Sequence, residues 1–185
     1  MGVTALLRGG GWLLLALLAL PAAAADFAVD QVTLEKRQGE WLARARWTAP
    51  WQRPPFRQVR EGVPVEFTME FRVFRRRSWW YDARVATVRA RREVYYNRLT
   101  RQYRIIDRRS GERHFTRDWA RARALVQRCG PLPLIDSERL GEGDYYVAVR
   151  VRASQERLSL PARVLTTLTG GWRGVSEWRY HPLTP

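Results

Sequence analysis

The fold is decided by residues 63–96, which read VPVEFTMEFRVFRRRSWWYDARVATVRARREVYY. Apolar side chains occupy every second position in residues 63–73, and a second alternating run occupies residues 86–96. Alternation with a period of two over this length indicates β-strands with one buried face and one solvent-exposed face. The stretch therefore predicts two long strands joined by a turn at residues 75–82.

The turn between these strands is rich in arginine and aromatic side chains. Its six residues of these types are Arg75, Arg76, Arg77, Trp79, Trp80 and Tyr81. Three consecutive arginines are difficult to bury, and two adjacent tryptophans are costly to expose. We predict that the turn is a binding surface, together with Arg101 and Arg104 of the next strand. The alternative is a solvated face on which arginine stems cover the tryptophan rings.

An N-terminal hairpin is predicted at residues 27–36 and 41–48, with residues 37–40 as its turn. In its second arm Trp41 and Trp47 share one face with two alanines, whereas the first arm alternates less regularly. An irregular first arm is typical of an edge strand or of a strand with a bulge.

The second half of the chain contains further strand patterns and one amphipathic helix. Strands are predicted at residues 99–106, 145–153 and 172–181, and a short helix at residues 161–169. In the amphipathic helix Thr116 is the expected cap and Gly130 the expected stop. Its core-facing stripe is formed by Trp119, Ala122, Val126 and Cys129.

These elements amount to about seven strands and one confident helix. Long strands joined by short turns favour antiparallel pairing over crossover connections. We predict a single, mainly antiparallel β domain of the α+β class, a sandwich or curled sheet with the helix packed on one side.

Residues 1–25 are predicted to be a secretory signal peptide. Arg8 supplies a positive segment, residues 12–20 are apolar, and Ala23 and Ala25 are small where a signal peptidase requires it. We expect cleavage before Asp26 and a mature periplasmic domain of residues 26–185. The alternative is an uncleaved inner-membrane anchor, although residues 9–25 are shorter than the roughly 20 apolar residues of a spanning helix.

The mature chain is strongly basic. Without Arg8 it has 32 basic residues against 18 acidic ones, a net charge of +14, and Lys36 is its only lysine. Arginine binds carboxylate and phosphate in a bidentate manner, so an anionic partner is expected. Cys129 is the only cysteine, which precludes an intramolecular disulfide, and we expect it to be a small buried residue.

No catalytic or metal-binding motif is present. His114 and His181 are far apart and lack neighbours at metal-ligand spacing, and there is no nucleophile elbow or phosphate-binding glycine loop. We therefore expect no cofactor and no structural metal, and predict a protein that is not an enzyme. The alternative is an envelope hydrolase whose catalytic residues come together only in the fold.

Arginine beside tryptophan suits three classes of partner. At a membrane, arginine meets lipid phosphate and the indole lies at the level of the headgroups. The same residues would bind nucleic acid, or anchor a protein interface. Export disfavours nucleic acid, because an exported chain meets mainly lipid and envelope polymers.

Several short motifs carry a resemblance to a known family. Residues 99–104 read LTRQYR and follow WWYD at 79–82, with GVP at 62–64, HFT at 114–116, LP at 160–161 and SEWR at 176–179. The chain resembles the domain of unknown function 4390 family, exported bacterial proteins without an assigned activity. The resemblance implies an envelope protein of a Gram-negative bacterium and no catalytic residues. Through gene neighbourhood it also implies a membrane sensor histidine kinase as a candidate partner.

The sequence thus predicts a non-enzymatic binding or accessory module of the bacterial envelope. We expect it to act on an anionic envelope surface or on a membrane-protein partner, through the basic and aromatic turn and the neighbouring arginines.

Overall fold

The computed structural model describes residues 27–50, 54–155 and 173–184, and it confirms a mainly β fold with a small helical part. Its elements in chain order are β1 (Ala28–Arg37), β2 (Glu40–Thr48), α1 (Pro54–Arg60), β3 (Val65–Arg75), β4 (Ala83–Asn97), β5 (Gln102–Asp107), β6 (Arg113–Thr116), α2 (Trp119–Gln127), β7 (Arg128–Asp136), a 3-10 turn (Ser137–Arg139), β8 (Tyr145–Gln155), β9 (Arg173–Val175) and β10 (Arg179–Leu183). The expected signal segment, the expected helix at 161–169 and Trp172 lie outside the described residues.

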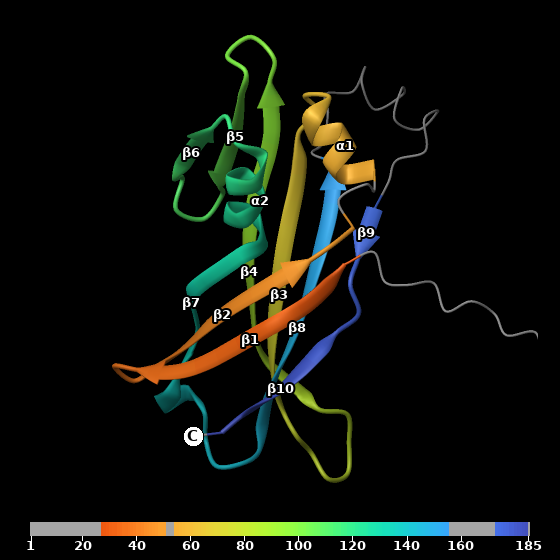
Figure 1. Ribbon diagram of the computed structural model, residues 1–185. Helices are drawn as coiled ribbons and strands as arrows, with labels where there is room; N and C mark the ends of the chain where they lie inside the picture. The colour runs from red at the N-terminus through yellow and green to blue at the C-terminus, as the bar shows by residue number, and fades with distance from the viewer. Residues whose placement is uncertain (1–26, 51–53, 156–172, 185) are drawn as a thin grey trace, which may run out of the picture.

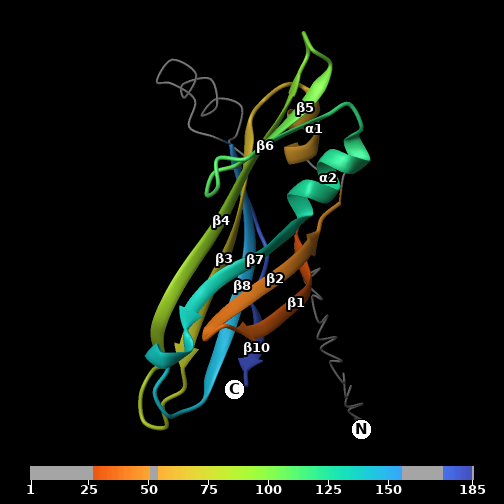
Figure 2. The ribbon, with the colours of Figure 1, turned by 90° about the vertical axis from the view of Figure 1, so that its left-hand side faces the viewer.

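The strands form two antiparallel sheets (Figure 1). The larger sheet has seven strands in the order β10-β8-β3-β4-β5-β6, with β9 paired to β8. The smaller sheet has the order β1-β2-β7 and lies across one face of the larger one (Figure 2). The long hairpin is confirmed, because β3 pairs with β4 from Val65 and Val94 to Arg75 and Ala83.

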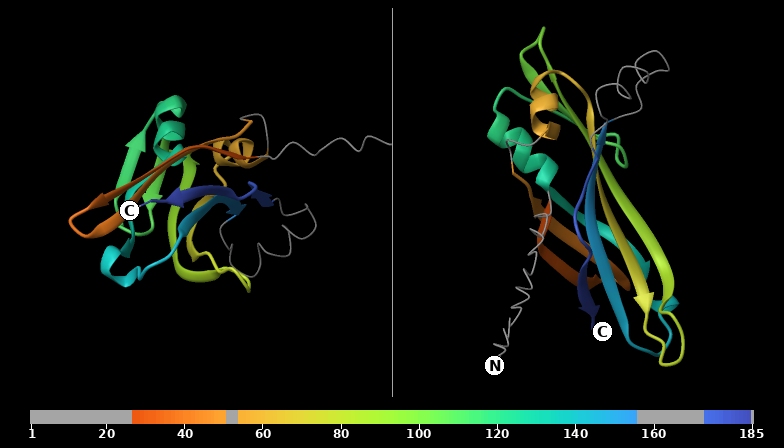
Figure 3. Two further views of the ribbon diagram at one scale, coloured as in Figure 1. Left: turned by 90° about the horizontal axis from the view of Figure 1, so that it is seen from below. Right: turned by 90° about the vertical axis from the view of Figure 1, so that its right-hand side faces the viewer.

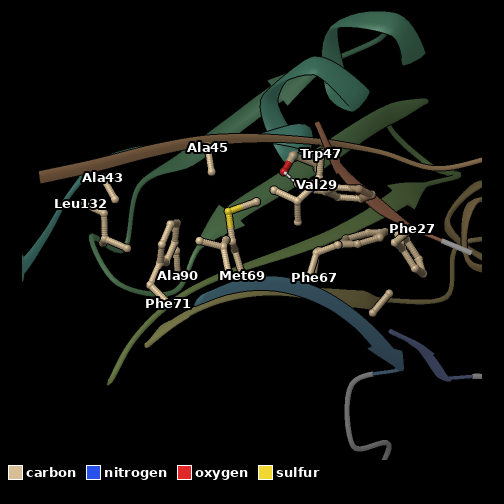
Figure 4. Packing of buried hydrophobic residues seen from close by; sticks show 14 of the residues in the cluster. Phe27, Val29, Ala43, Ala45, Trp47, Phe67, Met69, Phe71, Ala90 and Leu132 are labelled. Atoms are coloured by element: carbon tan, nitrogen blue, oxygen red, sulfur yellow. Dashed lines mark hydrogen bonds between the residues drawn. The ribbon is translucent and has the colours of Figure 1, made fainter. Parts of the chain in front are cut away.

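The core lies between the two sheets and follows the alternation of the sequence. Side chains of one parity on β3 and β8 are buried and face the smaller sheet, which contributes Trp41 and Trp47. An aromatic cluster closes one end of this core (Figure 4). The ring of Phe67 lies 5.1 Å from that of Trp47 and 5.6 Å from that of Phe56.

The predicted N-terminal hairpin is also confirmed. Strand β1 pairs with β2 along its length, and the register shifts between Val29 and Gln31. Strand β1 is the edge of its sheet, so the irregular alternation of the first arm reflects both an edge position and a bulge. The short helix α1 ends before Gly62, whose φ of +89° suits glycine.

The amphipathic helix is shorter than predicted, and its cap is a different residue. The side chain of Asp118 accepts a hydrogen bond from the backbone N–H of Ala120, whereas Thr116 belongs to β6. After Gln127 the chain becomes β7, which pairs with β2, so Cys129 lies on a strand and not on the helix. Pairing with the edge of β2 satisfies the backbone there in place of a further helical turn.

Three other expectations about strands are wrong in detail. Residues 99–101, predicted as the start of a strand, lie in the turn before β5, and Leu99 is exposed. The expected C-terminal strand is divided into β9 and β10, which both pair with β8. With β6 and β7 added, the described part of the chain contains ten strands instead of about seven.

Because β4 is long, the turns before and after it lie at opposite ends of the molecule. The loop between β3 and β4, residues 76–82, lies at one end, and the turn between β4 and β5 lies at the other (Figure 3). The loop at residues 141–144 lies beside residues 76–82, because β4 and β8 both begin opposite Arg75, the last residue of β3.

Candidate functional site

The loop at residues 76–82, called the tip loop below, presents three adjacent aromatic side chains to solvent. Trp79 is 95% exposed, Trp80 76% and Tyr81 88%. Large aromatic side chains usually contribute to a core or to an interface. Their exposure at the end of a long hairpin makes the tip loop the first candidate for a contact surface.

The base of the tip loop is held by hydrogen bonds within the loop, to β8 and to the loop that precedes β8. The carboxylate of Asp82 accepts from the backbone N–H of Arg77 at 3.2 Å and from the hydroxyl of Tyr146 at 2.8 Å. The backbone N–H of Arg76 donates to the carbonyl of Asp144 at 2.8 Å. These bonds fix the two ends of the loop, whereas Trp79, Trp80 and Tyr81 at its apex are exposed.

The three arginines of the tip loop region are exposed and not internally neutralised. None of Arg75, Arg76 and Arg77 forms an ion pair within the described residues. The Arg75 guanidinium instead donates to the carbonyl of Glu142 at 2.5 Å, and that of Arg76 lies 5.7 Å from the Tyr146 ring centroid. The arginines therefore remain available to an external anion.

The loop beside Arg75 contains a glycine in a backbone conformation that other residues rarely adopt. A Cβ on Gly143, where φ is +141°, would lie 2.9 Å from the Arg75 Nε. Glycine at this position lets the loop at residues 141–144 approach the start of the tip loop. That loop also contains the acidic residues Glu142 and Asp144, whose backbone carbonyls accept hydrogen bonds from Arg75 and Arg76.

A hollow of about 230 Å³ lies at the base of the tip loop. It is lined by Arg76, Asp82, Tyr146, Tyr180, His181 and Pro182. Burial, and then the hydrogen bond to Asp82, raise the pKa of Tyr146 to about 12. Burial, and then the charge of Arg179, lower the pKa of His181. The Tyr146 hydroxyl is thus harder to ionise, which is the opposite of what an activated nucleophile requires.

Arg101 and Arg104, predicted to belong to the same surface, lie at the other end of β4. Arg101 is exposed in the turn before β5 with a φ of 53°. The Arg104 guanidinium donates to the Tyr95 hydroxyl at 3.0 Å and lies 5.9 Å from the Phe115 ring centroid. The structure therefore brings the six tip residues together and places these two arginines elsewhere.

Sequence reasoning missed a cluster of charges on the outer face of the larger sheet, the face opposite the smaller sheet. Its centre is Glu70, which is 2% exposed and forms ion pairs with four arginines. These are Arg72, Arg89, Arg150 and Arg152. Alternation placed Glu70 on this face, but only the register of three strands could show that the arginines converge on it.

Trp178 completes this cluster. Its ring lies 4.5 Å from the Arg72 guanidinium carbon and 4.1 Å from that of Arg150. Cation–π contacts of this kind add to the ion pairs that hold Arg72 and Arg150 in place. The alternative of a solvated strand face, on which arginine side chains cover a tryptophan ring, therefore applies to this region and not to the tip loop.

The described residues contain neither a metal-binding cluster nor a membrane-spanning helix. No group of three or more His, Cys, Asp and Glu side chains is placed to hold a metal ion there. Within the same residues, no helix has the length and apolar character needed to cross a membrane.

Comparison with protein families gives one match, which covers residues 24–181. The matching family is described as Domain of unknown function (DUF4390). The chain belongs to this family. Comparison with curated proteins and with solved structures gives no match. Membership of the DUF4390 family covers both sheets and the tip loop, and it assigns no activity to them.

Proposed function

We propose that the protein is a non-enzymatic binding module of the bacterial envelope that docks its tip loop on a membrane surface containing anionic lipid. One observation carries this proposal: three consecutive aromatic side chains are exposed at the end of the longest hairpin. Export to the envelope rests on the signal-like pattern of residues 1–25.

The chemistry of the tip loop suits the boundary between lipid and water. Indole and phenol rings partition to the level of the headgroups, where the ring is in an apolar layer and its polar group stays hydrated. Arg75, Arg76 and Arg77 follow directly behind the rings and would reach lipid phosphates. The hydrogen bonds of Asp82 fix the base of the loop, so docking would require little ordering of the chain.

Charge alone would not hold the tip loop on a membrane. Asp82, Glu142 and Asp144 belong to the same region as Arg75, Arg76 and Arg77, although no ion pair joins the two groups within the described residues. The aromatic side chains must therefore supply most of the binding free energy, with the net positive charge of the domain adding long-range attraction.

The proposal is tested by co-sedimentation of the purified protein with lipid vesicles. We expect binding to vesicles containing phosphatidylglycerol, weakening as salt rises. The variant W79A/W80A should bind at least about ten-fold less tightly, since two indoles leave the interface. The matched control L99A/F115A removes two exposed apolar side chains at the other end of the molecule and should bind as wild type. Equal binding to charge-neutral vesicles, or equal binding by W79A/W80A, would contradict the proposal.

A second candidate is a membrane-protein partner, such as the sensor histidine kinase that the family resemblance implies. The hollow at the base of the tip loop supports it, because Asp82, Tyr146 and His181 offer directional hydrogen-bonding groups to a partner side chain. A photo-crosslinking residue at position 79 or 80 should then capture one dominant envelope protein in cells. Many unrelated products would argue against this candidate.

A further inference from the structure

A second hollow lies on the outer face of the larger sheet, at the point where β5 ends beside β4. The register between these strands ends at Arg92 and Asp107, and the backbone N–H of Arg108 then donates to the carbonyl of Arg91 at 2.9 Å. The turn that follows β5 therefore stands against β4. The hollow between them has a volume of about 280 Å³ and is lined by Thr87, Arg89, Arg91, Arg108 and Arg109.

Two of the four lining arginines are held by buried carboxylates. The Arg89 guanidinium lies 3.0 Å from the Glu70 carboxylate, and that of Arg108 is bonded to Glu93. Both glutamates are buried at the floor of the sheet. These ion pairs fix the two guanidinium groups beside the hollow, so a ligand would not have to order them.

The other two arginines carry uncompensated charge. Within the described residues, neither Arg91 nor Arg109 forms an ion pair with a carboxylate. Glu70 also compensates the hollow only in part, because its single negative charge is shared among four arginines within 3.8 Å. The hollow therefore has a positive potential that an anion would relieve.

We propose that this hollow binds a phosphate group, as inorganic phosphate or as the phosphate of a monoester. Guanidinium groups match phosphate through two parallel N–H to oxygen bonds. Arginines from β4 and from the turn after β5 line the space, and Thr87 adds a hydroxyl donor. A tetrahedral anion has enough oxygens to meet donors from several directions, whereas a carboxylate offers only two.

This site is independent of the membrane docking proposed for the tip loop. Its lining residues begin at Thr87, beyond the start of β4, and include none of the tip aromatics. Variants of one site leave the other intact, so the two proposals can fail separately.

The test is a titration of the purified full-length protein with inorganic phosphate, followed by calorimetry and by NMR at constant ionic strength. We expect saturable binding, with amide shifts at Arg91, Arg108 and Arg109. The variant R91Q/R109Q should bind phosphate about ten-fold or more weakly, since charge-assisted hydrogen bonds are lost. The control R98Q/R101Q removes the same charge from the exposed turn at the end of β4 and should bind as wild type. Equal losses in both variants, or no saturable binding, would overturn the proposal.

Two further arms distinguish the source of the phosphate. Competition of bound phosphate by glycerol phosphate identifies a soluble monoester as ligand. Binding of the protein to vesicles containing phosphatidic acid tests a lipid headgroup as the source. A lipid headgroup is identified if R91Q/R109Q loses this binding and W79A/W80A keeps it. Failure in both arms together with a featureless phosphate titration would leave the hollow a solvated surface and overturn the assignment.

Discussion

Glu70 and Arg150 are direct cross-strand partners on β3 and β8, and the Arg150 Nη2 lies 2.8 Å from the Glu70 Oε2. On the other side, Glu70 is the register partner of Arg89 on β4, whose Nη2 lies 3.0 Å from the Oε1. A buried carboxylate is thus held between guanidinium groups of both neighbouring strands. The outer face of the larger sheet is organised around this one acid, because its loss would leave several arginines facing one another.

The first prediction is that Glu70→Gln lowers the free energy of unfolding by about 2 kcal/mol or more. The change removes a buried charge that four guanidiniums require, although the arginines reach solvent and part of the loss is screened. Glu66→Gln is the matched control, since Glu66 lies on the same face of β3 and its carboxylate accepts from the Thr68 hydroxyl, a hydrogen bond that glutamine also permits. Urea unfolding of both variants measures the difference, and equal losses would show that Glu70 has no special role.

The second prediction concerns acid. Burial alone would raise the pKa of Glu70, but hydrogen bonds and charges from Arg72 and Arg89 outweigh it and hold the pKa below its ordinary value of 4.5. The ion pairs therefore stabilise the fold fully above about pH 4.5, and this contribution is lost as the pH falls through the lowered pKa. Urea unfolding across this range should show a steeper loss in wild type than in Glu70→Gln. Parallel curves would contradict the assignment.

Asp107 should account for part of the acid sensitivity that remains in Glu70→Gln. Burial would raise its pKa, but the backbone N–H of Arg109 and the side chain of Arg92 lower it below 3.8. Its contribution has the same sign as that of Glu70 and is lost at lower pH.

The strands were predictable wherever alternation was long and local. The alternating runs in residues 63–96 and 145–153 are each about ten residues long. They form β3, β4 and β8 of the larger sheet, with the expected faces buried. The start of β7 was not predictable in this way. Cys129 continues the helical spacing of Trp119, Ala122 and Val126, and only pairing with β2, distant in sequence, turns that segment into a strand.

The tip loop was found as a group because its residues are consecutive. Arg101 and Arg104 were wrongly grouped with it. The tip loop precedes β4 and these two arginines follow it, so the whole length of β4 separates them. The hollow at Thr87 and Arg109 was missed for a related reason, because its lining comes from β4 and from the turn after β5. Register across several strands cannot be derived from one-dimensional spacing.

The third prediction is that Gly130→Ala destabilises the protein by about 2 kcal/mol or more. A Cβ at this position would lie 2.3 Å from the carbonyl oxygen of Ala43 and 2.9 Å from the Cα of Arg44, so β7 could not keep its place beside β2. Gly141→Ala is the control, because no atom lies within 4 Å of its added Cβ. Thermal unfolding should separate the two variants, and a Gly130→Ala protein as stable as wild type would refute the β2–β7 register.

The last prediction concerns the thiol of Cys129, the only cysteine of the chain. Burial raises its pKa from the ordinary value of 9.0 to about 11, and the nearby charge of Arg92 only partly opposes this. Because the thiolate is the reactive form, alkylation of the folded protein at mildly alkaline pH should be about 100-fold slower than that of the unfolded chain. Iodoacetamide labelling with and without urea, followed by mass spectrometry, measures the ratio, and Cys129→Ser supplies the blank. Equal rates would mean that Arg92 stabilises the thiolate and that Cys129 is a reactive site, whereas slow labelling confirms it as a packed residue of β7.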